Sequence, residues 1–180
     1  MELATLLEQN RETILGRWFD LIAGTYPEVT SAFLAKQKDQ FRNPVGHAIS
    51  QSIGPIYDQV LSAMDTDELL HALDGIVRIR SVQDFTPSEA VVFIFQLKTA
   101  IRDVTGAQIR DPDKWDDLLD LESRIDRVAL LAFEKFTECR EKLHEIRNNE
   151  IKSRALKLLE RVNVKPAISQ PEEERIDDDV

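Results

Sequence analysis

Residues 86–98 read Thr-Pro-Ser-Glu-Ala-Val-Val-Phe-Ile-Phe-Gln-Leu-Lys, and this stretch decides the fold class. Its first residues predict a helix start, because Thr86 suits an N-cap, Pro87 suits the first helical position and Glu89 can reach back to the cap. The residues that follow are apolar nearly all round a helix, which is typical of a helix buried at the centre of a bundle. We expect this helix to continue through Ile101 and to end near Gly106.

The sequence before this stretch also predicts helices. Asn43 suits an N-cap, and Asp65 with Glu68 three residues later resembles a capping box. Neither the alternation typical of strands nor an Asn-Gly hairpin turn is evident. The Gly54-Pro55 pair predicts a kink. We therefore predict an all-α helical bundle whose earlier helices occupy residues 2–23, 27–34, 44–64 and 65–79.

A long last helix is predicted to follow, starting at Asp111-Pro112 by the same capping logic. No proline or glycine occurs between Asp113 and Lys165. An uninterrupted helix over this length would extend to about 75 Å at 1.5 Å per residue. The sequence therefore predicts a C-terminal helix much longer than the others.

The apolar residues of this last helix recur at heptad spacing as far as Ile146, as in a coiled coil. Beyond Asn148-Asn149 the pattern shifts phase. The first part, near Trp115, Leu118, Ile125 and Phe133, is predicted to pack on the chain's own core. The later part is predicted to be a seam that pairs two chains, formed by Phe136, Cys139, Leu143 and Ile146.

Three segments are predicted along the chain: a helical domain over residues 1–147, a helical extension over 148–165 and a disordered acidic tail over 166–180. The tail carries six acidic residues and one arginine, and its net charge of −5 is half of the chain's net charge of −10. A segment so charged and so poor in apolar residues buries too little surface to fold.

Composition excludes several classes of protein. A net charge of −10 is repelled by phosphate backbones, so no nucleic-acid partner is expected. No run approaches the roughly 18 apolar residues of a membrane span, and no basic region precedes an apolar run at the N-terminus, so we expect no membrane insertion and no signal peptide. The single cysteine allows no internal disulfide. A cytoplasmic protein is expected.

The most conspicuous polar group comprises Arg78, Arg80 and Asp84. One interpretation is a site for an anion or a partner protein. The other is that the two arginines are cations near a helix C-terminus, where the helix dipole favours them. The second interpretation is about twice as common for such a pattern, and one arginine is then expected to pair with Asp84 or with a carboxylate of the last helix.

No catalytic set is recognisable, since the chain lacks a nucleophile–base pair and a glycine-rich phosphate loop. His47, His71 and His144 do not form a metal-binding motif, and surface or packed histidine is the default interpretation over haem ligation. Cys139 is interpreted as a packed residue, with a redox-sensing thiol as the rarer alternative. We assign no catalytic residue, no metal and no cofactor.

Three blocks resemble the N-terminal domain of the RsbRD family, the RsbT co-antagonist proteins. The blocks are residues 41–46, 76–90 and 92–98, and Trp18 with Tyr26-Pro27 fits the same pattern. The resemblance covers residues 6 to 142. It implies a helical sensory module, for which a globin-like arrangement is one option, and it implies a dimer. In that family the module precedes a STAS domain, which we do not find in this sequence.

The resulting hypothesis is a non-enzymatic sensory or signalling module, active in a stress or redox response, that forms a homodimer and contacts an unidentified protein partner. The alternative is a structural accessory subunit of a larger complex, such as an electron-transfer complex. A cofactor-dependent enzyme is the third option.

Overall fold

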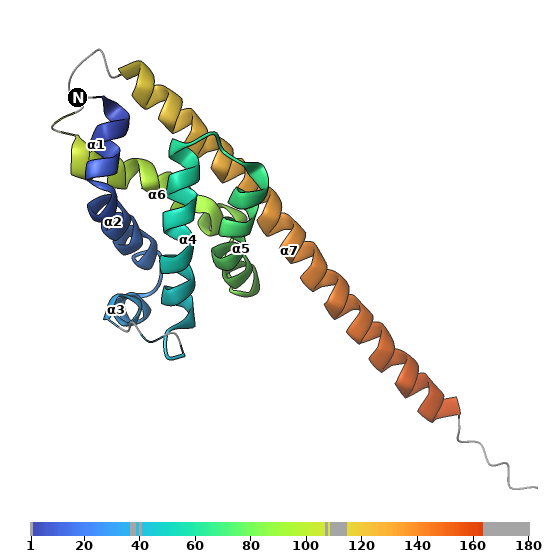
Figure 1. Ribbon diagram of the computed structural model, residues 1–180. Helices are drawn as coiled ribbons and strands as arrows, with labels where there is room; N and C mark the ends of the chain where they lie inside the picture. Colours follow the sequence, from blue (N-terminus) through green and yellow to red (C-terminus); the bar gives the residue numbers. More distant parts are fainter. Residues whose placement is uncertain (1, 37–38, 40, 107, 109–114, 164–180) are drawn as a thin grey trace, which may run out of the picture. The chain divides into compact units, whose positions relative to one another are not determined.

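The computed structural model describes residues 2–36, 39, 41–106, 108 and 115–163, and only helices occur as regular structure among them (Figure 1). The all-α prediction is confirmed. None of the described helices is both long and apolar enough to cross a bilayer. The predicted start at Asp111-Pro112 and the predicted acidic tail lie outside the described residues. The helices are α1 (Leu3–Gln9), α2 (Arg11–Ala23), α3 (Glu28–Lys36), α4 (Pro44–Leu61), α5 (Thr66–Val82), α6 (Pro87–Thr105) and α7 (Trp115–Asn163).

The chain divides into two compact units, Met1–Lys142 and Leu143–Val180. The first unit contains α1 to α6 and the beginning of α7. Within it α4 packs on α5, while α2 packs on both α6 and α4. The second unit contains the rest of α7. The long C-terminal helix predicted from the sequence is confirmed.

The start of α6 has the predicted capping box. The Thr86 backbone N–H donates to the Glu89 carboxylate at 2.9 Å, and the Glu89 N–H donates to the Thr86 hydroxyl at 3.4 Å. The buried face of α6 packs on α2, where the Trp18 indole donates to the Phe93 carbonyl at 2.6 Å. The helix is not buried all round, because Phe95 remains 43% exposed.

The N-caps of α4 and α5 also lie at the residues predicted from the sequence. The Asn43 side chain accepts from the Gly46 N–H at 2.8 Å and donates to the Leu34 carbonyl at 3.0 Å, so it ties the end of α3 to the start of α4. The Asp65 carboxylate accepts from the N–H groups of Asp67 and Glu68. The α4 helix is continuous through Pro55.

The prediction of a single helix over residues 2–23 is wrong. The structure has two helices there, α1 and α2, which meet at Asn10. The Asn10 amide donates to the Leu6 carbonyl at 2.8 Å, and its backbone leaves the helical region at φ −102° and ψ 8°. A short polar side chain that bonds its own backbone competes with the helical hydrogen bonds, which explains the break.

The first part of α7 completes the core of the first unit. The residues it buries lie on one face of the helix: Leu121, Ile125, Val128, Ala129, Ala132 and Phe136. Trp115 and Phe133, which we predicted to face the core, are 58% and 45% exposed. The reason is the helical repeat, because each residue turns by about 100° and Phe133 therefore points away from its buried neighbour Ala132.

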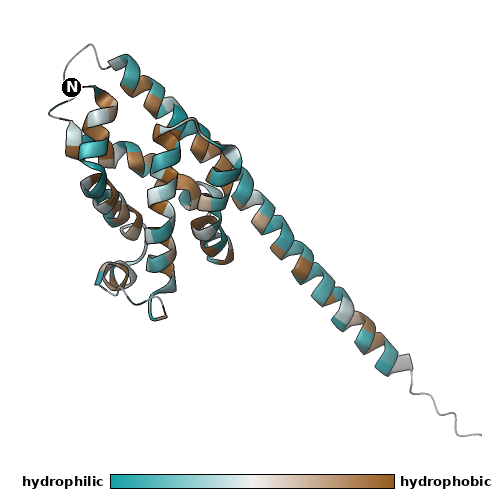
Figure 2. Ribbon diagram, viewed as in Figure 1, coloured by the Kyte–Doolittle hydropathy of each residue, from teal (hydrophilic) through white to brown (hydrophobic). Residues whose placement is uncertain are grey.

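The second unit is the rest of α7. Figure 2 shows hydrophobic residues recurring along this part of the helix among hydrophilic ones. An ion pair joins Arg154 to Glu150 one turn earlier. Five large apolar side chains are each about 60% exposed here: Ile146, Ile151, Leu156, Leu158 and Leu159.

Candidate functional site

Arg80 lies in the last turn of α5 and is fully buried. One terminal nitrogen donates to the Glu89 carbonyl at 2.9 Å and to the Ala90 carbonyl at 3.4 Å. The other donates to the Thr25 hydroxyl at 2.8 Å. Arg80 therefore ties the end of α5 to the start of α6 and to the turn after α2.

Three aromatic rings surround the Arg80 guanidinium. Its central carbon lies 5.4 Å from the ring centroid of Tyr26, 4.9 Å from that of Phe85 and 5.1 Å from that of Phe93. Burial lowers the pKa of Arg80, against a smaller opposing effect of Tyr26, and burial raises the pKa of Tyr26. Each ring face stabilises the cation by about 0.5–2 kcal/mol. Among the described residues no carboxylate pairs with Arg80, and its Nε has no hydrogen-bond partner.

The structure does not bring Arg78, Arg80 and Asp84 together as one surface site. Arg78 is exposed and pairs with Asp74 at 3.4 Å, which also pairs with Lys135 of α7 at 3.0 Å. Asp84 is exposed in the turn after α5, and neither arginine pairs with it among the described residues. Two residues apart on a helix means about 200° of rotation, so one arginine faces solvent while the other faces the core.

The histidines and the cysteine have unremarkable positions. His71 and His144 are exposed, and His47 is half-buried near the start of α4. Haem ligation needs a histidine in a deep apolar pocket, and none of the three has such surroundings. Within the described ranges no three His, Cys, Asp or Glu side chains gather as metal ligands. Cys139 is half-buried on α7.

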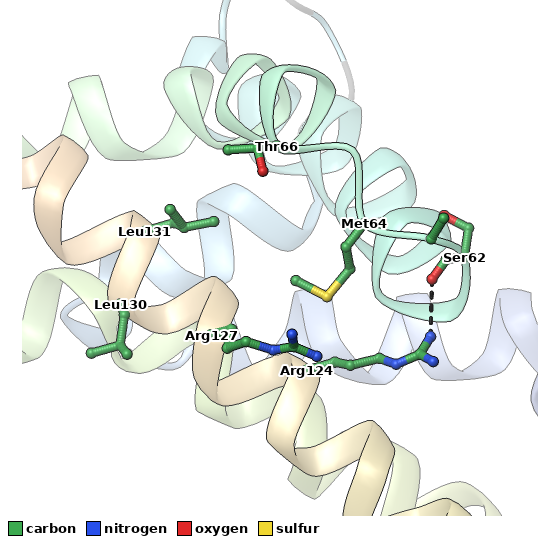
Figure 3. Close-up of a pocket in the computed structure, with 8 residues that line it drawn as sticks. Ser62, Met64, Thr66, Arg124, Arg127, Leu130 and Leu131 are labelled. Carbon is green, nitrogen blue, oxygen red and sulfur yellow. Dashed lines mark hydrogen bonds between the residues drawn. The ribbon is translucent and has the colours of Figure 1, made fainter.

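A groove that the sequence did not reveal lies between the α4–α5 connection and α7 (Figure 3). Its volume is about 440 Å³. Arg124 anchors one end, because its guanidinium donates to the Ser62 carbonyl at 2.9 Å and to the Val60 carbonyl at 3.4 Å. The lining residues are Ser62, Ala63, Met64, Thr66, Arg124, Arg127, Leu130 and Leu131.

Met64 shapes this groove from the connection side. Its φ of 57° lies in the left-handed region, which costs a non-glycine residue about 1–2 kcal/mol. Figure 3 shows the side chains of Met64 and Arg127 directed into the groove. The available sequence signal was the spacing of Arg124 and Arg127, which places two cations on one helix face. A backbone conformation such as that of Met64 leaves no comparable signal.

A second, more acidic groove of about 780 Å³ runs between α4 and α5. Asp67, Glu68, His71 and Asp74 line it. The two helices approach closely beside it, since a Cβ on Gly75 would lie 2.9 Å from the Ser52 hydroxyl. Asp74 is already paired with Arg78 and Lys135, and Glu68 accepts from Gln59, so two of the three carboxylates of this groove have partners within the chain.

Four exposed apolar side chains lie on α6 and α7, which two ion pairs join. The pairs are Lys98 with Asp126 at 2.6 Å and Arg102 with Glu122, and they indicate an antiparallel register. Continuing this register by one to two turns places Val92 and Phe95 of α6 opposite the part of α7 that carries Leu130 and Phe133. All four are exposed, between 36% and 66%. We call these four residues the α6–α7 face.

Comparison with known protein families gives a match over most of the chain. Residues 12–151 match the protein family described as the RsbT co-antagonist protein rsbRD N-terminal domain. This range includes α3 to α6 entirely and continues past Lys142 into the second unit. No curated protein and no solved structure matches the chain.

Proposed function

The chain belongs to the family of RsbT co-antagonist rsbRD N-terminal domains, and on this basis we propose that it is a cytoplasmic stress-response signalling module that acts through protein–protein contacts and has no catalytic activity. The family match over residues 12–151 is the observation that carries the proposal. A redox input is a narrower form of it, in which Cys139, the single cysteine, links two chains.

The partner that we propose first is a second copy of the chain, docked on the α6–α7 face. Exposed apolar side chains that gather in one place mark interaction surfaces. Two acidic side chains beside this face are already paired, Asp126 with Lys98 and Glu122 with Arg102. These two pairings reduce the repulsion between two chains that each carry a net charge of −10.

Light scattering on the purified chain at increasing concentration tests the dimer. We expect a dimer mass at tens of micromolar and its loss in Phe133→Asp, because a charge would be buried without a partner. The matched control is Phe41→Asp, an aromatic that is 94% exposed outside this face. A monomer at every concentration would contradict the homodimer.

The seam predicted from the sequence is the competing interface. Phe136 is 2% exposed because the core of the first unit buries it, whereas Cys139 and Leu143 are half-buried and Ile146 is exposed. Leu143→Asp tests the part of the seam that the core does not bury, which consists of Cys139, Leu143 and Ile146. A dimer that survives Phe133→Asp and dissociates in Leu143→Asp would place the interface on this seam.

The alternative function is a structural accessory subunit of a larger complex, including an electron-transfer complex. Its support is the second unit, where five large apolar side chains are each about 60% exposed on α7. A helix with that much unburied apolar surface fits a groove on a different protein. A monomer in solution that gains mass only with one specific protein would favour this function over the signalling module.

A further inference from the structure

We propose that the groove between the α4–α5 connection and α7 binds a small aromatic carboxylate. Its volume of about 440 Å³ lies within the range of ligand pockets, roughly 300–1,000 Å³. Apolar walls with a few converging polar groups are the usual composition of such sites. All of its lining residues lie in the first unit of one chain, so the groove is complete without a second copy, and it shares only Leu130 with the α6–α7 face.

The charge of the groove selects an anion. Arg127 is exposed and has no carboxylate partner among the described residues. Its neighbours three and four positions away on the helix are Ser123, Arg124, Leu130 and Leu131, so no acid lies within one turn of it on this face. A cation left in this state, in a chain with a net charge of −10, is available for an external carboxylate.

Arg124 makes the second cation of the groove rigid. Its guanidinium is held by the carbonyls of Val60 and Ser62 at the end of α4, so its position is fixed before any ligand arrives. The Arg127 guanidinium, directed into the same groove (Figure 3), is free to turn its planar fork toward a carboxylate. Bidentate pairing with a carboxylate is the geometry for which arginine is suited.

The apolar side chains of the groove select the rest of the ligand. Leu130 is 66% exposed and Leu131 is half-buried, so both offer apolar surface that a ligand can cover. The Met64 thioether faces the groove from a left-handed backbone position. Methionine sulfur packs favourably at the edges of aromatic rings, and guanidinium groups stack on ring faces. An aromatic body attached to the carboxylate satisfies both.

The test uses 3-phenylpropionate as the probe and 3-phenylpropan-1-ol, a neutral alcohol with the same carbon skeleton, as the control ligand. Titration of the full chain followed by ¹H–¹⁵N NMR should give a Kd on the order of 1 mM for the carboxylate, because a ligand of this size covers little surface in an open groove. The alcohol should bind about tenfold more weakly, because it lacks the charge-assisted hydrogen bonds.

Two variants with the same change in charge provide the control. Arg127→Gln should weaken binding of the carboxylate about tenfold. Arg147→Gln removes an exposed arginine elsewhere on α7 and should leave binding unchanged. Equal affinities of the two variants would overturn the proposal, as would equal affinities for the carboxylate and the alcohol. Inorganic phosphate binding as tightly as 3-phenylpropionate would overturn the aromatic part.

Discussion

The two parts of α7 show how one helix serves two purposes. Up to Lys142 its apolar residues lie on a face that the first unit buries, including Ile125 and Phe136. From Leu143 onward the helix keeps apolar residues such as Ile151 and Leu158, which are more than 60% exposed. Apolar residues at helical spacing therefore do not reveal what covers them, because the same pattern supports a core in one part and leaves an open surface in the other.

The largest effect is expected from removing a core side chain in the first part of α7. Phe136→Ala should lower the free energy of unfolding by about 3–5 kcal/mol, because it deletes a buried ring and leaves a cavity. Leu158→Ala in the second part should change it by less than about 0.5 kcal/mol. Urea unfolding measures both. Similar losses in the two variants would break the comparison.

The polar part of the same core gives the next effect. Arg80→Met should lower the free energy of unfolding by about 2–4 kcal/mol, because the carbonyls of Glu89 and Ala90 lose their shared donor and the rings lose the cation. Arg78→Met, two residues earlier and exposed, should cost less than about 0.5 kcal/mol. Thermal melts of the two variants give the difference, and a stable Arg80→Met protein would show that the cation is dispensable.

Alkaline pH should weaken the first unit selectively. Burial raises the pKa of Tyr57 to about 12 from its ordinary value near 10, and the neutral hydroxyl donates to the Leu7 carbonyl at 3.0 Å. Because the folded pKa is the higher one, this contribution is complete below pH 10 and is lost as the pH rises toward 12. The loss should amount to about 2–3 kcal/mol.

Tyr57→Phe provides the control for this pH effect. The variant should be about 1 kcal/mol less stable at neutral pH, since the Leu7 carbonyl loses its donor, but it should lose less stability between pH 10 and 12. Urea midpoints across this range measure the slope. Identical slopes for both proteins would show that Tyr57 does not titrate with unfolding.

The smallest effect is expected at the start of α6. Thr86→Ala should cost about 1 kcal/mol through the lost cap of α6. Thr30→Ala, at an exposed position inside α3, should not destabilise the chain, because alanine is the better helix former. An unchanged urea midpoint in Thr86→Ala would mean that packing alone fixes the start of α6.

Local signals allowed much of the fold to be predicted from the sequence. The caps at Asn43, Asp65 and Thr86 lie where they were predicted, because a cap depends on residues within three positions of it. The candidate site was harder to predict from the sequence. Arg80 differs from Arg78 only in the direction in which it points, and its rings come from Tyr26, Phe85 and Phe93, which are distant in sequence or on other elements.

The sequence by itself determined the helical class, the helix starts and the length of the last helix, since these follow from hydrogen bonding and side-chain spacing along the chain. Only the tertiary structure decided which apolar faces are covered, why Phe136 is buried while Phe133 is exposed, and where Met64 meets Arg127 to form a groove. Burial and concavity depend on contacts between elements far apart in sequence, and no local pattern encodes those contacts.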